Sequence, residues 1–176
     1  MKDKLFLLSA EETMFTWAFA NSSDNKRTIR SCGQFFWLRS MRPNNEDSLV
    51  VSVIDPDGDV DRTCTFVAQG VRPCMHLANL EDLPRDAKNF VEFGTKFGSF
   101  RREKLKWCIL DEETGWVIAK EAICNRKFNS SIRPCNFEKS ELRQFLNTTL
   151  ADALFSEEEK KRIVPVVLDG EAHHLA

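Results

Sequence analysis

The sequence predicts an α+β domain made of short antiparallel strands and hairpins with two to three helices. Three observations predict this class. The pair Asp57-Gly58 separates two apolar runs, as in a tight β-hairpin. The polar stretch 112–115 separates two more runs in the same way. Two Ser-x-x-Glu capping boxes, starting at Ser9 and Ser156, mark the beginnings of helices.

The first helix is expected to begin after Ser9. The Ser9 hydroxyl can accept a hydrogen bond from the backbone N–H of Glu12, while the Glu12 carboxylate reaches back to the backbone of Ser9. Apolar residues continue to about Ala20, and the polar stretch 21–25 then ends the helix.

A three-stranded meander is expected to follow. Phe35–Arg39 is a short β-like run, and Leu49–Ile54 is a second. The Asp57-Gly58 turn reverses the chain into Val60–Val67, and Gly70–Leu77 is expected to be the third strand of the meander.

The second part of the chain repeats the hairpin pattern. Residues 81–91 are charged, contain Pro84 and show no apolar period, so they are interpreted as a linker. Lys104–Leu110 and Trp116–Ile123 then form the expected second hairpin. An amphipathic helix is expected over about Glu138–Leu150, and a short helix after Ser156. Residues 171–176 show no packing signal and are expected to be a tail.

Composition limits the classes of protein to which the chain can belong. Of 176 residues, 42% are hydrophobic and 30% charged, which is typical of a globular domain. A net charge of -2 without a basic stripe excludes non-specific nucleic-acid binding. No apolar stretch approaches the ~20 residues of a membrane span, so we expect a cytoplasmic protein with no membrane partner. The six cysteines form no C-x-x-C motif; we expect reduced thiols and no cofactor.

Two ordered blocks of motifs resemble one bacterial domain family of unknown function, whose members commonly read D-x-x-F-L-L-S, W-W-L-R-S, D-G and G-V-R-P-A. The second half of that family resembles Asp3–Ser9, Phe36–Ser40, Asp57-Gly58 and Gly70–Pro73. Its first half resembles Phe93-Gly94, Leu105–Leu110, Ser140–Asn147 and Phe155–Lys160. The chain departs from the family at Phe36, where Trp is usual, and at Cys74, where a small apolar residue is usual.

The two halves therefore stand in circularly permuted order. Residues 1–80 correspond to the second half, 81–91 to a linker and 92–170 to the first half, within a single domain 1–170. The resemblance implies a C-type-lectin-like fold, a group that also contains formylglycine-generating enzymes and diversified binding proteins. A short linker can join the old ends because loop-closure entropy grows slowly with length. A closed monomer, a domain-swapped homodimer and a piece of a tandem array all remain open.

Four carboxylates alternate along one stretch and form the weak candidate for a metal site. Asp55, Asp57, Asp59 and Asp61 could supply oxygen ligands to calcium. The glycine is in the fourth position of this stretch, whereas a calcium loop of the EF-hand type has it in the sixth. We therefore interpret the stretch as a hairpin turn, in which Asp and Gly serve the backbone geometry, and expect no metal.

The most recognisable motifs contain residues that are expected to be structural. Arg39 and Arg72 each stand beside apolar strand residues, so we expect interior arginines whose donors tie loops to the sheet. Binding of an anionic ligand is the alternative. Trp37 is expected in the core.

No residue cluster identifies a reaction, and we expect no catalytic residues. His76 has no obvious triad partner in sequence, and His173 lies on the expected tail. An enzyme of the formylglycine-generating type would need a reactive cysteine pair, and none of the six cysteines matches one.

The sequence therefore favours a non-catalytic module that recognises a protein partner through surface loops. Two long polar loops, around 42–47 and 126–136, are the expected binding face. Its candidate residues are Arg42, Asn44, Asn45, Glu46, Asp47, Arg126 and Arg133. The alternatives are a lectin-like domain for a carbohydrate or small ligand, and a small enzyme.

Overall fold

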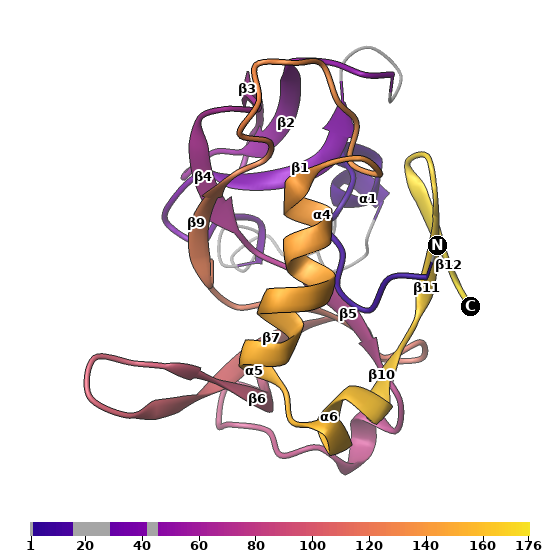
Figure 1. The fold of residues 1–176 in the computed structure, drawn as a ribbon. Coiled ribbons are helices and arrows are strands. Elements are labelled where there is room, and N and C mark those ends of the chain that lie inside the picture. The colour runs from indigo at the N-terminus through magenta and orange to yellow at the C-terminus, as the bar shows by residue number, and fades with distance from the viewer. Residues whose placement is uncertain (1, 16–28, 42–45) are drawn as a thin grey trace.

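The fold was examined in a computed structural model, which describes residues 2–15, 29–41 and 46–176 (Figure 1). Its described part is an α+β fold dominated by antiparallel sheets, with a few short helices. The first sheet contains β1 (Phe36–Met41), β2 (Val50–Ile54), β3 (Val60–Cys64), β4 (Ala68–Val71) and β9 (Cys124–Lys127), in the order β3-β2-β1-β4-β9. The second contains β5 (Cys74–Leu77), β6 (Val91–Phe97), β7 (Arg102–Asp111), β8 (Trp116–Ala119) and β10 (Ile163–Val164), in the order β10-β5-β8-β7-β6.

The two expected hairpins are present. In the β2–β3 hairpin, Val50 pairs with Cys64 at one end and Ile54 pairs with Val60 at the other. Gly58 in the turn between them has a φ of 94°. β7 and β8 form the second hairpin. Gly115 in its turn has a φ of 69° and packs against the backbone of Leu77, where no larger residue fits.

The expectation of a single strand over Gly70–Leu77 is wrong. The chain forms β4 and β5 there, and the two strands belong to different sheets. The break falls at Arg72-Pro73, where Pro73 cannot donate a backbone hydrogen bond. β4 does not continue the meander either, because it lies parallel beside β1 and antiparallel to β9.

Both capping boxes are confirmed: Ser9 and Glu12 exchange hydrogen bonds at the start of α1 (Ala10–Phe15), and Ser156 and Glu159 do so at α6 (Glu157–Arg162). The long helix begins later than expected, after the cap residue Ser140. It runs as α4 (Glu141–Phe145), a π-helical turn η2 (Leu146–Leu150) and α5 (Ala151–Leu154). This long helix, labelled α4 and α5, lies in front of the sheets in Figure 1, whereas α1 lies beside β1 and α6 beside β10.

Residues 171–176, expected to be a tail, take part in a C-terminal hairpin of β11 (Val166–Asp169) and β12 (Ala172–Leu175). The hairpin lies beside the N-terminal segment, where Asp3 exchanges two backbone hydrogen bonds with Val166. The short helix η1 (Leu80–Asp82) overlaps the start of the expected linker 81–91. The linker then forms a turn held by Asp86, whose Oδ1 accepts from the backbone N–H groups of Lys88 and Phe90.

The core consists of two apolar clusters separated by extended segments. The N-terminal segment alternates between them: Leu5 and Leu7 pack into one cluster, Phe6 and Leu8 into the other. Strand β1 also alternates between the clusters: Trp37 packs into the first, and its neighbours Phe36 and Leu38 pack into the second. Because successive side chains of an extended strand point to opposite faces, these two segments form a wall with apolar surface on both sides.

Candidate functional site

The two loops expected to form a binding face lie side by side. Ser48 and Cys135 exchange backbone hydrogen bonds of 3.0 and 3.1 Å, which join the loops although 87 residues separate them in sequence. Asp47 forms an ion pair of 3.1 Å with Lys139, and Glu46 is exposed. Arg42, Asn44 and Asn45 lie outside the described residues. The described parts of the two loops thus form one continuous surface.

The second of these loops is fastened at both ends. Its first residues, Phe128 and Asn129, donate backbone hydrogen bonds to the carbonyl of Thr65. Ser130 donates to both carboxylate oxygens of Glu141, at 2.5 Å from Oγ and 3.1 Å from the backbone nitrogen. The far end closes where the Ser140 hydroxyl caps α4. Between these anchors the loop presents Ile132, which is 72% exposed.

The two arginines expected on this face have different environments. Arg126 lies on β9, where its guanidinium sits 3.9 Å above the ring of Phe145 and its backbone carbonyl accepts a hydrogen bond from Nε1 of the buried Trp37. Arg133 is exposed in the loop, next to Ile132. Arg133 therefore has more freedom to meet a partner than Arg126.

The alternating aspartates form the hairpin turn. Asp55 Oδ1 accepts from the backbone N–H groups of Asp57 and Asp59, both at 2.9 Å, so this carboxylate stabilises the turn backbone. Asp61 accepts from the N–H of Arg62. Among the described residues, no group of three or more His, Cys, Asp or Glu side chains is arranged to hold a metal ion.

Arg39 and Arg72 are both interior. Arg72 is 1% exposed; its Nε donates to the carbonyl of Ala119 at 2.6 Å, it also bonds the carbonyl of Ile29, and its guanidinium lies 5.0 Å from the centre of the Phe36 ring. Arg39 is 3% exposed and bonds the carbonyl of Leu7 and the carboxylate of Glu12. Arg39 thus fastens the N-terminal segment to β1, and Arg72 fastens Ile29 and the end of β8 to the break between β4 and β5.

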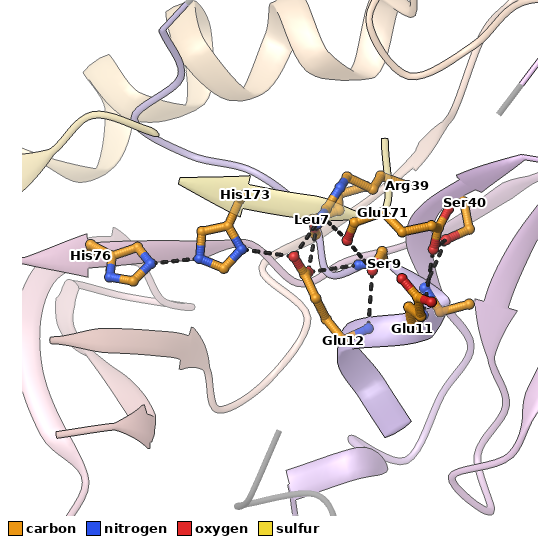
Figure 2. Close-up of polar contacts among 10 residues, drawn as sticks. Leu7, Ser9, Glu11, Glu12, Arg39, Ser40, His76, Glu171 and His173 are labelled. Atoms are coloured by element: carbon orange, nitrogen blue, oxygen red, sulfur yellow. Dashed lines mark hydrogen bonds and ion pairs between the residues drawn. The ribbon is translucent and has the colours of Figure 1, made fainter. Parts of the chain in front are cut away.

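A buried polar network surrounds Arg39 and was not expected from the sequence (Figure 2). Glu12 accepts two bonds of 2.6 Å from Arg39 and one of 2.9 Å from the backbone of Ser9. His173 of β12 approaches the same carboxylate with Nδ1 at 2.7 Å. On its other side, His173 Nε2 lies 2.8 Å from Nε2 of His76.

Glu171 is the second residue through which this network holds the C-terminal hairpin. The carbonyl of Glu171 accepts from Arg39 at 2.6 Å and from the Ser9 hydroxyl at 2.7 Å. Its carboxylate accepts from the Ser40 hydroxyl at 2.6 Å and from the backbone N–H of Glu11 at 3.4 Å. The hairpin therefore docks on α1 and β1 through charge-assisted hydrogen bonds, which are stronger than neutral ones.

The hydrogen-bond partners indicate the tautomers of the histidine pair. His76 Nδ1 faces the carbonyl of Thr114 at 2.9 Å, so it carries a hydrogen. His173 Nδ1 faces the Glu12 carboxylate, so it also carries a hydrogen. Two neutral rings then turn their Nε2 lone pairs towards each other at 2.8 Å. A hydrogen bond at this contact would need a further proton between the two Nε2 atoms.

The electrostatics of the site favour the neutral form of His76. Burial lowers the pKa of His76, and the neighbouring His173 lowers it further, against the opposing bond to the Thr114 carbonyl. Burial alone would raise the pKa of Glu12, but hydrogen bonds from His173 and Arg39 outweigh it and hold that pKa below its usual value. Glu12 is thus a carboxylate held between Arg39 and His173.

The rings of this site are enclosed by aromatic side chains. His76 stacks between Phe6 and Trp116, with ring centres 6.1 and 5.8 Å away. Trp116 also meets His173 edge to face at 4.5 Å. Because His76 is only 2% exposed, the pair can share a proton but presents little surface to a substrate.

A cavity of about 240 Å³ lies between this network and the loop face. It is lined by Arg39, Met41, Asn136, Phe137, Glu138, Arg143, Leu168 and Gly170. Both arginines in its wall are already paired with carboxylates: Arg39 with Glu12, and Arg143 with the buried Asp3 at 2.9 Å. Burial raises the pKa of Asp3, against the opposing effect of Arg143.

A family model described as "Domain of unknown function (DUF6273)" matches residues 1–79. This agrees with the resemblance of residues 1–80 to a domain family of unknown function. The match spans α1 and β1–β5, including Glu12, Arg39 and His76 of the polar network, but not His173. No curated protein and no solved structure matches the chain. None of the described helices has the length and apolar character needed to cross a membrane.

Proposed function

We propose that the chain is a non-catalytic module that binds a protein partner through the face formed by residues 46–48 and 126–139. One observation carries the proposal: two loops distant in sequence are joined by the Ser48–Cys135 bridge and present one surface. The bonds from Ser130 to Glu141 hold the second loop in place before a partner arrives. A surface ordered in advance loses less conformational entropy on binding.

The chemistry of this face suits a protein partner. Ile132 supplies an exposed apolar contact, and Arg133 stands beside it. Glu46 and Asp47 supply acidic groups. An apolar centre with a mixed-charge rim is the usual composition of a protein–protein interface.

The cysteines give little support to the alternative of a formylglycine-generating type of enzyme. All six are free thiols. Burial raises the pKa of Cys74, Cys108, Cys124 and Cys135, well above the ordinary value for Cys74. Thiolate formation is therefore disfavoured, and the thiolate is the form that reacts. A lectin-like carbohydrate site remains the second alternative.

We also propose a C-type-lectin-like domain in circularly permuted order, working in the cytoplasm of a bacterial cell or as a phage protein. In support of the permutation, residues 1–80 and 92–170 contribute strands to both large sheets, through the pairs β4–β9 and β5–β8. Either a closed monomer or a domain-swapped homodimer can contain these pairs. Six free thiols fit a reducing compartment.

The test is affinity capture from a lysate of the source cells with the tagged chain, in parallel with the variant Ile132→Asp/Arg133→Glu. The control is Lys161→Glu, which changes an exposed residue of α6. We expect one partner at near-equal stoichiometry with the parent and the control, and its loss with the loop variant at an unchanged melting temperature. Equal capture by the loop variant, or capture of nothing, would contradict the proposal.

A carbohydrate-binding domain would give a different result. A ligand that binds only the folded state raises the melting temperature. Stabilisation by calcium or by a sugar, together with no captured protein, would favour the lectin-like alternative.

A further inference from the structure

The β6–β7 hairpin extends from the body of the molecule (Figure 1). It carries two exposed phenylalanines. Phe97 at the end of β6 is 78% exposed, and Phe100 in the turn is 101% exposed. They are the two most exposed large hydrophobic side chains among the described residues. Clustered exposed apolar side chains commonly mark a binding surface.

The end of the hairpin is ordered. Phe97 pairs with Arg102 across the strands, and the N–H of Gly98 donates to the carbonyl of Arg101 at 2.7 Å. The Arg102 guanidinium donates to the hydroxyl of Thr95 at 2.9 Å and to the carbonyl of Ala153 at 2.9 Å. It also lies 5.1 Å from the centre of the Phe97 ring. The rings are thus held away from the core by a paired backbone and a fixed arginine.

The charge of the hairpin is opposite to that of the rest of the chain. Its basic residues are Lys96, Arg101, Arg102, Lys104 and Lys106, and its acidic residues are Glu92, Glu103 and Asp111. Residues 91–111 therefore carry a net charge of +2, and because the whole chain carries -2, the remainder carries -4. An anionic surface attracts the hairpin and repels the body, which orients the molecule with Phe97 and Phe100 foremost.

A second copy of the chain is a poor occupant for this hairpin. One apolar depression of the body is lined in part by Ile29, Phe90 and Ile109. Its charged lining residues are Lys88, Lys120 and Glu121, and the Lys120 ammonium lies 4.8 Å from the centre of the Phe90 ring. The lining therefore carries one net positive charge, which repels the basic hairpin of another molecule.

We propose that the β6–β7 hairpin is a peripheral membrane anchor, which inserts Phe97 and Phe100 into the interface of a bilayer rich in anionic phospholipid. A bilayer accepts two neighbouring rings without a matching pocket, and its anionic headgroups pair with cations placed behind the inserted rings. Lys96, Arg101 and Lys104 are next to the rings in this arrangement. The anchor lies on the surface and needs no spanning helix, and it goes beyond the proposed protein-binding face.

The test is co-sedimentation of the full chain with vesicles of phosphatidylcholine containing about a third phosphatidylglycerol, against vesicles of phosphatidylcholine alone. We expect binding to the anionic vesicles, weakened by salt because surface charges are screened. Replacing either ring, by Phe97→Ser or Phe100→Ser, should weaken binding about tenfold, and the variant Arg101→Glu/Lys104→Glu should abolish it. Ile132→Ser is the matched control, since it removes an exposed hydrophobic side chain at the loop face.

Three outcomes would overturn the anchor. These are no sedimentation of the parent chain, equal binding of the Phe97→Ser/Phe100→Ser variant, and equal binding to neutral vesicles. Loss of protein capture by the phenylalanine variant, without vesicle binding by the parent, would assign the hairpin to a protein partner instead. The proposed protein-binding face is tested separately, because its test is protein capture with the variant Ile132→Asp/Arg133→Glu. A melting temperature equal to that of the parent chain shows that a variant folds.

Discussion

The burial of His76 predicts that the protein loses stability as the pH falls below about 6.5. Burial lowers the pKa of His76 in the folded chain, whereas in the unfolded chain a histidine titrates near pH 6.5. As the pH falls through that value, the unfolded chain takes up a proton that the folded His76 does not bind. The contribution of His76 to the free energy of unfolding is therefore fully present above pH 6.5 and is lost as the pH falls.

The size of the effect follows from the same count. If the folded His76 stays neutral throughout, integration gives a loss of about 1.4 kcal/mol between pH 7.5 and pH 5.5. The measurement is urea unfolding followed by tryptophan fluorescence at pH 5.5, 6.5 and 7.5. The contributions of other titrating groups cancel when the parent chain is compared with a variant at each pH.

The informative variant is His76→Gln, with His174→Gln on exposed β12 as the control. The variant lacks the buried histidine whose pKa is lowered, so its stability should fall less than that of the parent chain between pH 7.5 and pH 5.5. The control should keep the full loss. An equal pH dependence of the parent chain and the His76→Gln variant would refute the reasoning.

Two further substitutions test the buried contacts. Glu12→Gln removes the carboxylate that Arg39 and His173 contact, and it should lower the free energy of unfolding by about 3 kcal/mol. Glu11→Gln, at an exposed residue of the same helix, should change it little. Similar melting temperatures of the two variants would contradict this expectation. Gly115→Ala would place a Cβ 2.1 Å from the carbonyl oxygen of Leu77 at a φ of 69°, and should cost about 3 kcal/mol in a denaturant titration. Gly33→Ala, at a φ of 81° but in open space, should cost only about 1 kcal/mol, and equal losses would rule out the steric explanation.

Elements that depend on neighbouring residues could be predicted from the sequence. The turn at Asp57-Gly58 and the capping boxes at Ser9 and Ser156 have their partners within a few residues, and the structure contains all three. The sequence does not predict the strand break at Arg72-Pro73, because strand-like residues stand on both sides of it. Only the pairing with distant strands shows that β4 and β5 belong to different sheets. Periodicity contains no information about which sheet a strand joins.

The polar network could not be predicted for the same reason. His76 and His173 are 97 residues apart, and the segment around His173 has no apolar period. One local signal was available: Glu12 was expected to cap its own helix, which it does. A carboxylate has two oxygens and several lone pairs, so a cap residue can also bind Arg39 and His173. The sequence indicates the first role, whereas the others depend on the folded chain.

The network also explains why the C-terminal hairpin is held against the body. A two-stranded hairpin is marginally stable in isolation, and β11 and β12 form a separate two-stranded sheet. Its attachment therefore depends on the bonds of Glu171 and His173, together with the backbone pair between Asp3 and Val166. Because β12 supplies His173, which contacts Glu12, loss of the Glu12 carboxylate would act directly on this attachment. Leu168 and Gly170 of the same hairpin line the cavity beside the loop face, so loosening the attachment would open that cavity from one side.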